Sequence, residues 1–320
     1  MTRRPWIAAL LGAACLAHAA SAQEPIAAAA ITDIVPIAID RSTRMTVPVH
    51  VDGSGPYAFV VDTGAERTVI SRELATTLRL DDAGTATLLS MSGTGPVQTV
   101  HIPTLGVSTG MIRDIRAPTL DRANLGAAGI LGIDSLKKQR VLLDFTAGTM
   151  AITPSKKREP PWDGDAIVVT AQSRFGQLVL VDASVDGRKI HVIIDTGAQV
   201  SVGNAALQRL VGKKKLAPFV PIDLISVTGG IMPALYSAIP DVRIGGLHIA
   251  NLPVAFAEVQ PFKKFGVQNK PALLLGMDGL KLFDRVSIDF ANRRVRFLVP
   301  EGGSDGGLLL TALERPAGGG

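Results

Sequence analysis

The sequence predicts an all-β protein built from two similar halves, and three observations lead to that prediction. Hydrophobic residues make up 47% of the 320 residues while aromatic residues make up only 4%, so the core must consist mainly of aliphatic side chains. The Val and Ile of these apolar runs favour strands, because β-branched side chains pack well on a pleated surface. Several short motifs also occur twice in the same order, with a proline-rich segment between the two sets, which indicates an internal duplication.

The strands expected in each half are short and end at Gly or Asp. In the first half, apolar or alternating runs predict strands within 45–53, 58–62 and 141–152. In the second half, the run 178–195 predicts a hairpin that turns at the Asp-Gly pair 186–187, since Asp-Gly is a favoured two-residue turn.

Two short helices are expected at matched positions. Ser71 is a good N-cap for a helix over 72–80, and Glu73 places a negative charge in the first turn, where the helix dipole favours it. The stretch 204–211 is the corresponding helix of the second half. The sequence therefore predicts a β protein with only short helices.

Three landmarks recur in both halves. Each half contains an Asp-Thr-Gly-Ala motif after an apolar run, then a segment with glycine between short polar residues, then an Ile-Leu-Gly or Leu-Leu-Gly run. They lie at 62–65, 89–96 and 129–136 in the first half, and at 195–198, 225–233 and 273–280 in the second. Three landmarks in one order are strong support for duplication of a domain.

Changes in composition mark the domain boundaries. Residues 154–165 are rich in proline and charge and include a Pro-Pro pair, which favours extended backbone, so we interpret them as a linker. The first domain is then expected over 33–153 and the second over 166–300. Residues 301–320 are rich in glycine and predict a flexible tail.

The N-terminus is typical of an export signal. Arg3 and Arg4 precede a short apolar run over 6–17, and the small residues 20–22 provide a cleavage site. A membrane-spanning helix needs about 20 apolar residues, more than this run contains. We therefore expect a signal peptide over 1–22, an exported protein that is periplasmic or secreted, and no integral membrane segment after cleavage.

Charge and cysteine content narrow the possible partners. Cys15 is the only cysteine and lies within the expected signal, so the mature chain would have neither a disulfide nor a cysteine nucleophile. The formal net charge is +5, but the basic residues are scattered apart from the triplet 213–215. Without a basic stripe interleaved with aromatic residues, a solvated surface is favoured over a nucleic-acid interface.

The two aspartates are the candidate functional residues. A single Asp-Thr-Gly at a strand end is also compatible with a simple turn, in which Asp bonds its own backbone and Gly supplies a positive φ. Two copies at matched positions, Asp62 and Asp195, favour a working pair instead. Two carboxyl groups about 3 Å apart cannot both ionise, so they share one proton and can act as general acid and general base.

On these residues the sequence resembles the retropepsin-like aspartic proteases, specifically bacterial exported forms with two such domains in one chain. The resemblance rests on the two Asp-Thr-Gly-Ala motifs and on the Gly132 and Gly276 runs, and it covers about residues 33–299. It implies two tandem closed-barrel domains related by a pseudo-twofold axis. It also implies an aspartic endopeptidase that acts as a monomer on a polypeptide substrate.

The resemblance also implies roles for individual residues. Asp62 and Asp195 would form the catalytic dyad that holds the attacking water. The dyad would be supported by Thr63, Gly64, Ala65, Thr196, Gly197 and Ala198, with the two threonines interlocking beneath it. Substrate contacts would come from Glu66 and Gln199 and from glycine-rich flap tips, namely Ser92, Gly93, Gly95, Thr228, Gly229 and Gly230. No metal and no cofactor is expected.

Other functional classes fit less well. Serine proteases of the subtilisin type need a catalytic His and Ser, and none of the five histidines is followed by Gly. No His-Glu-x-x-His motif or Cys/His cluster suggests a metal hydrolase. The alternative that stays open is a non-catalytic exported peptide-binding module (a pseudo-protease) with the same cleft, since a groove can capture an extended peptide by strand addition.

The motif also predicts a pH range. Ala65 and Ala198 stand where pepsins have Ser or Thr, so hydroxyl hydrogen bonds that would favour the ionised aspartates are absent. We therefore expect a milder optimum than that of pepsin, about pH 5 to 6.

Overall fold

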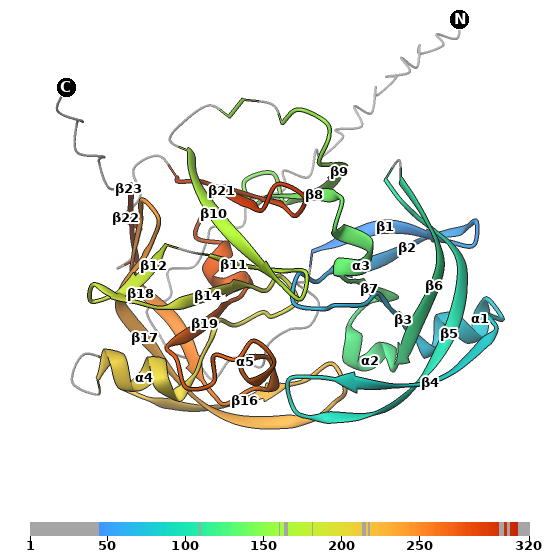
Figure 1. Ribbon diagram of the computed structural model, residues 1–320, viewed down its shortest axis with the longest axis horizontal. Coiled ribbons are helices and arrows are strands. Elements are labelled where there is room, and N and C mark those ends of the chain that lie inside the picture. The colour runs from blue at the N-terminus through green and yellow to red at the C-terminus, as the bar shows by residue number, and fades with distance from the viewer. Residues whose placement is uncertain are drawn as a thin grey trace, which may run out of the picture.

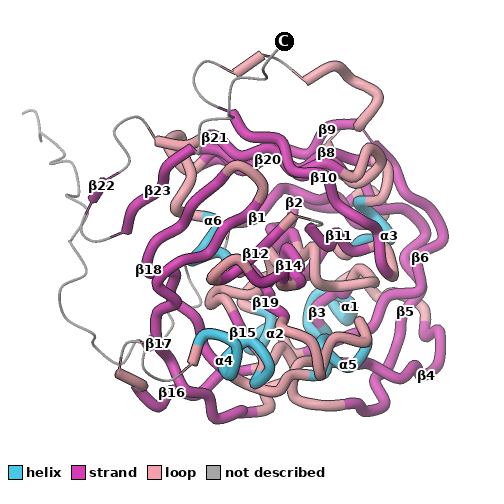
Figure 2. The backbone as a smooth tube through the Cα atoms, turned by 60° about the vertical axis from the view of Figure 1, so that its left-hand side comes forward, coloured by secondary structure: helices cyan, strands magenta, loops and turns pink. Residues whose placement is uncertain are grey.

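A computed structural model describes residues 45–108, 110–159, 161–162, 166–180, 182–212, 216, 218–300, 304–305 and 308–312. The expected signal peptide at 1–22 lies outside the described residues. Within the described part of the chain, no helix combines the length and the apolar character needed to cross a membrane. Strands dominate and the helices are short, as Figure 2 shows, in agreement with the all-β prediction.

The first half is a closed barrel. Its strands are β1 (Thr46–Val51), β2 (Ser54–Val61), β3 (Val69–Ser71), β4 (Asp82–Leu89), β5 (Thr94–Val107), β6 (Gly110–Leu120) and β7 (Gly129–Leu131). Six of them pair in the order β1-β2-β7-β3-β6-β5, and pairing of β1 with β5 closes the barrel. Strand β4 continues the sheet beyond β5 and forms a long hairpin with it.

The second half repeats this connectivity. Its strands are β10 (Ala166–Arg174), β11 (Gln177–Leu180), β12 (Ala183–Val185), β13 (Arg188–Lys189), β14 (His191–Ile194), β15 (Val202–Gly203), β16 (Val220–Ile225), β17 (Ile231–Ile244), β18 (Leu247–Phe256) and β19 (Ala272–Leu275). Strand β14 is parallel to β19, as β2 is to β7, and β15 lies between β19 and β18, as β3 lies between β7 and β6. The duplication seen in the sequence is thus a duplication of topology.

One sheet joins the two halves. Strands β8 (Gln139–Asp144) and β9 (Thr149–Pro154) come from the first half, and β20 (Arg285–Asp289) and β21 (Arg294–Leu298) come from the second. They pair in the order β10-β21-β20-β8-β9, on the side of the molecule away from β4 and β16 in Figure 1. Because backbone hydrogen bonds run from β8 to β20, this sheet fixes the position of one half relative to the other.

The six helices described are α1 (Arg72–Thr77), α2 (Arg122–Leu125), α3 (Ile133–Leu136), α4 (Ala205–Val211), α5 (Gln260–Lys264) and α6 (Met277–Leu280). The two expected helices are confirmed as α1 and α4, and their N-caps Ser71 and Asn204 each accept a bond from a backbone N–H in the first turn. Helix α1 ends before the expected residue 80, because Arg79 adopts a positive φ of 52°.

Two other local expectations can be compared with the structure. The turn at Asp186 and Gly187 is confirmed, with φ values of 50° and 72° that suit a two-residue hairpin between β12 and β13. Within the expected tail at 301–320, the structure describes β22 (Ser304–Asp305) and β23 (Leu308–Ala312), and the flexibility of the tail stays a prediction. Strand β23 pairs with the edge of β18 through Leu310, Thr311 and Ala312, which complete open backbone hydrogen bonds.

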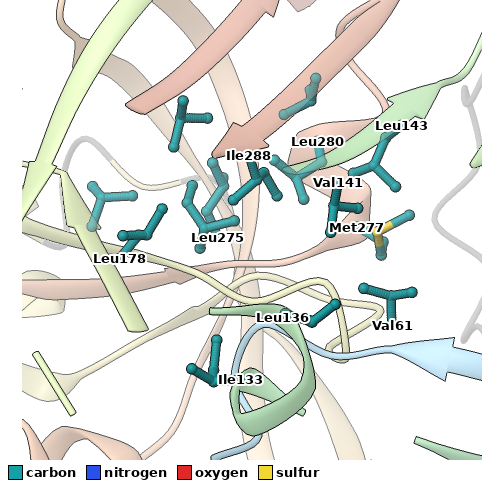
Figure 3. Close-up of a cluster of buried hydrophobic side chains, with 14 of the residues drawn as sticks. Val61, Ile133, Leu136, Val141, Leu143, Leu178, Leu275, Met277, Leu280 and Ile288 are labelled. Atoms are coloured by element: carbon teal, nitrogen blue, oxygen red, sulfur yellow. The ribbon is translucent and has the colours of Figure 1, made fainter. Parts of the chain in front are cut away.

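One hydrophobic core cluster contains residues of both halves, and each half also has a smaller cluster of its own. Figure 3 shows side chains from both halves pointing toward one another, among them Val61, Leu136, Leu275 and Ile288. All four are completely buried. The two halves therefore share this cluster as well as the sheet. Because burying one such side chain stabilises the fold by about 1.5 to 3 kcal/mol, the shared cluster holds the two halves together. The segments that emerge from this core are therefore held rigidly.

Candidate active site

The two Asp-Thr-Gly-Ala segments begin where buried strands end. Asp62 follows β2 and Asp195 follows β14, and both strands lie inside their sheets with neighbours on both sides. The backbone N–H of Asp62 donates to Leu131 O at 3.0 Å, and that of Asp195 donates to Leu275 O at 3.0 Å. Each aspartate is therefore placed by a fixed strand rather than by a mobile loop.

Each carboxyl group is held by the backbone of its own loop. Asp62 Oδ1 accepts from the N–H groups of Gly64 and Ala65 at 2.7 and 3.0 Å. Asp195 Oδ1 accepts from those of Gly197 and Ala198, both at 3.1 Å. This bonding is what a simple turn would show, so the arrangement of the loops relative to each other decides between a turn and a pair.

The two loops face each other at very short range. A Cβ atom on Gly64 would lie 2.6 Å from Asp195 Oδ1, and a Cβ on Gly197 would overlap the carboxyl group of Asp62. Each carboxyl thus packs on the glycine of the opposite loop, which brings the two carboxyl groups close together. Only glycine permits this approach, which explains why both motifs need it.

Two threonines lock the loops together below the carboxyls. Thr63 N and Thr196 N each donate to the Oγ1 of the other residue at 3.1 Å. Thr63 Oγ1 donates to Ile194 O at 2.8 Å, and Thr196 Oγ1 donates to Val61 O at 2.7 Å. The four bonds cross between the halves and leave none of these buried hydroxyls unused.

The two aspartates differ in their surroundings. Asp195 is only 8% exposed, whereas Asp62 is partly exposed. Burial, and after it the negative charge of Asp62, raises the pKa of Asp195 to about 7, although the N–H groups of its own loop act in the opposite direction. The pair therefore holds one proton in the weakly acidic range, where two free carboxyls would both be ionised.

A further pair of carboxylates supports the loops from behind, and it was not predicted from the sequence. Asp134 Oδ1 accepts from Thr68 N and Thr68 Oγ1, and Asp278 Oδ1 accepts from Ser201 N and Ser201 Oγ. Both aspartates stand two residues after the glycine of the repeated Leu-Gly runs. The signal available in the sequence was therefore the repeated Gly-x-Asp spacing.

A cavity of about 1160 Å³ lies over the two aspartates, and both halves line it. Its wall is largely apolar, and it includes the predicted substrate contacts Glu66 and Gln199. One end carries a cross-domain ion pair, because Lys264 Nζ of α5 lies 2.8 Å from Glu66 Oε1. The pseudo-equivalent position, Gln199, carries no charge, so the two ends of the cavity differ.

Two hairpins contribute residues to the cavity wall, β4–β5 from the first half and β16–β17 from the second, and they carry the segments predicted as flaps. Their tips touch, with Ser92 Oγ 3.3 Å from Thr228 Oγ1. The predicted flap residues lie at these tips except Gly95, which lies in β5 opposite Leu88. The six predicted residues do not themselves line the described part of the cavity: Ser92, Gly93, Gly95, Thr228, Gly229 and Gly230.

The flap residues that do line the cavity were missed. Ser90 and Met91 of the first flap and Val227 of the second face the cavity. The flaps also exchange contacts, because Met91 packs against the apolar cluster of the second half and Val227 packs against that of the first. No local sequence pattern reveals this, since each flap packs on residues of the other half.

Among the described residues, no group of three or more His, Cys, Asp or Glu side chains is arranged to hold a metal ion. Asp62 and Asp195 line the cavity side by side, together with the charged residues Glu66, Arg67, Asp223 and Lys264. Two carboxyls that share one proton can take a proton from one atom and give a proton to another.

Comparison with known protein families agrees with this geometry. The family described as "gag-polyprotein putative aspartyl protease" matches residues 47–138, and the family described as "Aspartyl protease" matches residues 181–278. Asp62 lies within the first match and Asp195 within the second. A search of curated proteins returned no match.

Proposed function

This chain belongs to the retropepsin-like aspartyl proteases and contains two of their domains in tandem, and from that premise we propose that it is an aspartic endopeptidase. In this proposal Asp62 and Asp195 form one dyad within a single chain. The packing of each carboxyl on the glycine of the other loop is the observation that supports the proposal most directly.

The proposed reaction uses the single shared proton. The ionised carboxylate takes a proton from a water, whose oxygen attacks the carbonyl carbon of the peptide. The protonated carboxyl gives its proton to the carbonyl oxygen, which forms a tetrahedral diol. The carboxyl that took the proton from water then gives it to the amide nitrogen, while the other carboxylate takes a proton from a hydroxyl of the diol. The C–N bond breaks, a carboxylic acid and an amine are released, and the dyad again holds one proton.

The proposed substrate is a polypeptide bound in extended form beneath the flaps. The cavity volume of about 1160 Å³ holds several side chains, and its apolar lining suits hydrophobic residues beside the cleaved bond. Because one chain supplies both aspartates and both flaps, the proposal needs no second copy. We further propose that the protein is exported, which rests on the signal pattern at 1–22.

Cleavage of an unfolded protein tests the proposal. Casein is incubated with the wild type, Asp62→Asn and Asp195→Asn, and new N-termini are counted by mass spectrometry. Each substitution should reduce cleavage by at least about 1000-fold, because neither half of the acid–base pair can be replaced by an amide. Asp114→Asn is the matched control, since this carboxylate is 85% exposed and remote from the dyad.

The outcome also decides between catalysis and peptide capture. Equal cleavage by all four proteins would show that a contaminant or another site is responsible. If none of them cleaves but all bind the same extended peptides, the chain is the peptide-binding module considered above. Either result would contradict the enzymatic proposal.

A further inference from the structure

Gln177 connects the second half of the protein to the active-site loop of the first. It begins β11 and is only 2% exposed, yet it lines the cavity over the dyad. Its Nε2 donates to the carbonyl oxygen of Gly64. The side chain thus crosses the domain boundary and ends on the Asp-Thr-Gly-Ala motif that contains Asp62.

The hydrogen bond from Gln177 can influence the carboxyl of Asp62 through one peptide group. The carbonyl of Gly64 and the N–H of Ala65 belong to one peptide group, and this N–H donates to Asp62 Oδ1 at 3.0 Å. When a carbonyl accepts a hydrogen bond, its peptide is polarised and the N–H becomes a stronger donor. A stronger N–H donor favours the ionised form of the carboxyl that accepts from it.

We propose that Gln177 is a positioning residue that acts through the Gly64–Ala65 peptide to make Asp62 the ionised member of the dyad and to leave the shared proton on Asp195. This inference rests on the proposed function for its consequence in catalysis. It assigns different tasks to two aspartates whose sequence motifs are identical. Asp62 takes the proton from water, and Asp195 donates to the carbonyl oxygen of the substrate.

The second active-site loop shows no matching bond. Within the described part of the chain, no side chain donates to the carbonyl of Gly197, and Arg44, which corresponds to Gln177 by strand register, lies outside the described residues. Asp195 is also the more buried of the two carboxyls, which favours its neutral form. Burial and the bond from Gln177 thus act in the same direction.

The described charged side chains around the cavity do not account for the difference. Among the described residues, those lining it apart from the two aspartates are Glu66, Arg67, Asp223 and Lys264, two acidic and two basic. Glu66 and Lys264 neutralise each other at 2.8 Å, and Arg67 and Asp223 are exposed and therefore screened by solvent. Compared with these four described side chains, the hydrogen-bonded path from Gln177 is the more specific influence on Asp62.

The Oε1 atom of Gln177 indicates that this residue is not present for stability alone. Its Oε1 is buried and has no hydrogen-bond partner among the described residues. A buried acceptor without a partner costs stability, and an apolar residue of similar size avoids that cost. Gln177→Leu should therefore fold about as well as the wild type while it loses the bond to Gly64.

The test compares Gln177→Leu with Gln172→Leu, an exposed glutamine on the same hairpin as the matched control. The pH dependence of kcat/KM is measured on one peptide substrate. In Gln177→Leu, the pH at which kcat/KM falls to half on the acid side should rise by about 0.5 to 1 pH unit. The value of kcat should fall about 3- to 10-fold, with KM nearly unchanged. Gln172→Leu should match the wild type.

A second readout does not depend on turnover. With ¹³C-labelled aspartate, the carboxyl signals of the dyad are titrated by NMR, using Asp62→Asn and Asp195→Asn for assignment. The wild type should show Asp62 ionising at lower pH than Asp195, and Gln177→Leu should narrow that gap. An unchanged titration, or a rise in KM alone, would overturn the inference. If no substrate is cleaved, the endopeptidase proposal fails while the titration still tests the asymmetry.

A stability measurement completes the test. Thermal unfolding of Gln177→Leu should remain within about 2 °C of the wild type, because the lost bond is offset by removal of the unpaired Oε1. If that variant does not fold, Gln177→Met removes the same donor with a more adaptable side chain and takes its place in both titrations.

Discussion

Thr63 and Thr196 are joined by hydrogen bonds that run in both directions between the two halves of the protein. Each residue supplies a backbone donor and a hydroxyl acceptor to the other, and each hydroxyl donates to the carbonyl that precedes the opposite aspartate. Because these groups are buried, water cannot replace a missing partner. The two active-site loops are consequently fixed relative to each other before any substrate arrives.

Thr63→Val tests the contribution of this lock. Valine keeps the shape of threonine but leaves the N–H of Thr196 and the carbonyl of Ile194 buried without partners. Each orphaned group costs about 1 to 3 kcal/mol, so the free energy of unfolding in urea should fall by about 2 to 4 kcal/mol. Thr63→Ser, which keeps the hydroxyl, should lose less than half as much; an equal loss would assign the effect to packing instead.

Gly197→Ala tests the close approach of the loops. An added Cβ would overlap the Asp62 carboxyl and push the two aspartates apart. A displacement of about 1 Å is sufficient to lower kcat by about 100-fold, while the barrels themselves are untouched. Gly246→Ala is the control, because its Cβ would meet Ile167 at an ordinary 3.7 Å. Full activity of Gly197→Ala would mean that the dyad does not require this geometry.

The raised pKa of Asp195 predicts how stability depends on pH. The folded protein holds this proton up to about pH 7, whereas the ordinary value of 3.8 applies when the chain is unfolded. Between these values the folded state binds more protons, so the stability that the group contributes is present at low pH and is lost as the pH rises toward 7.

Asp195→Asn removes this dependence. Relative to the wild type, the variant should gain about 2 to 4 kcal/mol in free energy of unfolding between pH 4 and pH 8, since the amide is never buried as an anion. Denaturant titrations at a series of pH values measure the difference. Parallel stability curves for the two proteins would contradict a raised pKa at this site.

Much of the site could be predicted from the sequence, because its chemistry is carried by local motifs. Asp62 and Asp195 each stand at the end of an apolar run, and the caps Ser71 and Asn204 follow from residue type and spacing alone. Such features depend on the nearest few residues. Because the Asp-Thr-Gly-Ala motif occurs at matched positions in two halves of one chain, the sequence also indicated that the two motifs lie in one site.

The features that were missed all depend on contacts between distant segments. The sheet in which β8 pairs with β20 joins strands more than 140 residues apart, and no period in the sequence encodes that register. Gln177 has no motif around it and gains its position only when β11 pairs with β14. Met91 likewise became a cavity residue because its flap packs on the other half.

The shared proton also predicts a bell-shaped activity profile. Activity requires one proton on the dyad, so it should decline above about pH 7, as Asp195 loses its proton, and at low pH, as Asp62 gains one. The optimum should therefore lie at about pH 5 to 6, which agrees with the expectation from Ala65 and Ala198. The profile of kcat/KM on one peptide measures it, and a maximum near pH 2 would contradict the assignment.

The ion pair between Lys264 and Glu66 predicts an asymmetric preference for charge along the substrate. The segment 257–271 that carries Lys264 is longer than its counterpart 121–128 in the first half, and it forms one end of the cavity. Lys264→Met keeps the apolar stem beside Phe175 but leaves the Glu66 carboxylate facing the cavity unpaired. Stability should change by less than about 1 kcal/mol, because Glu66 is half exposed.

Substrate choice should change more than stability. In Lys264→Met, peptides with a basic residue at this end should gain about 5- to 10-fold in kcat/KM over matched acidic peptides, since the carboxylate of Glu66 now attracts a positive charge. Paired peptide libraries that differ only in the charge of one residue measure the ratio. Lys263→Met, on the same helix but exposed and outside the cavity lining, is the matched control and should leave the ratio unchanged. An equal shift in both variants would show that net charge, rather than the pairing of Glu66 with Lys264, controls selection at this end of the cavity.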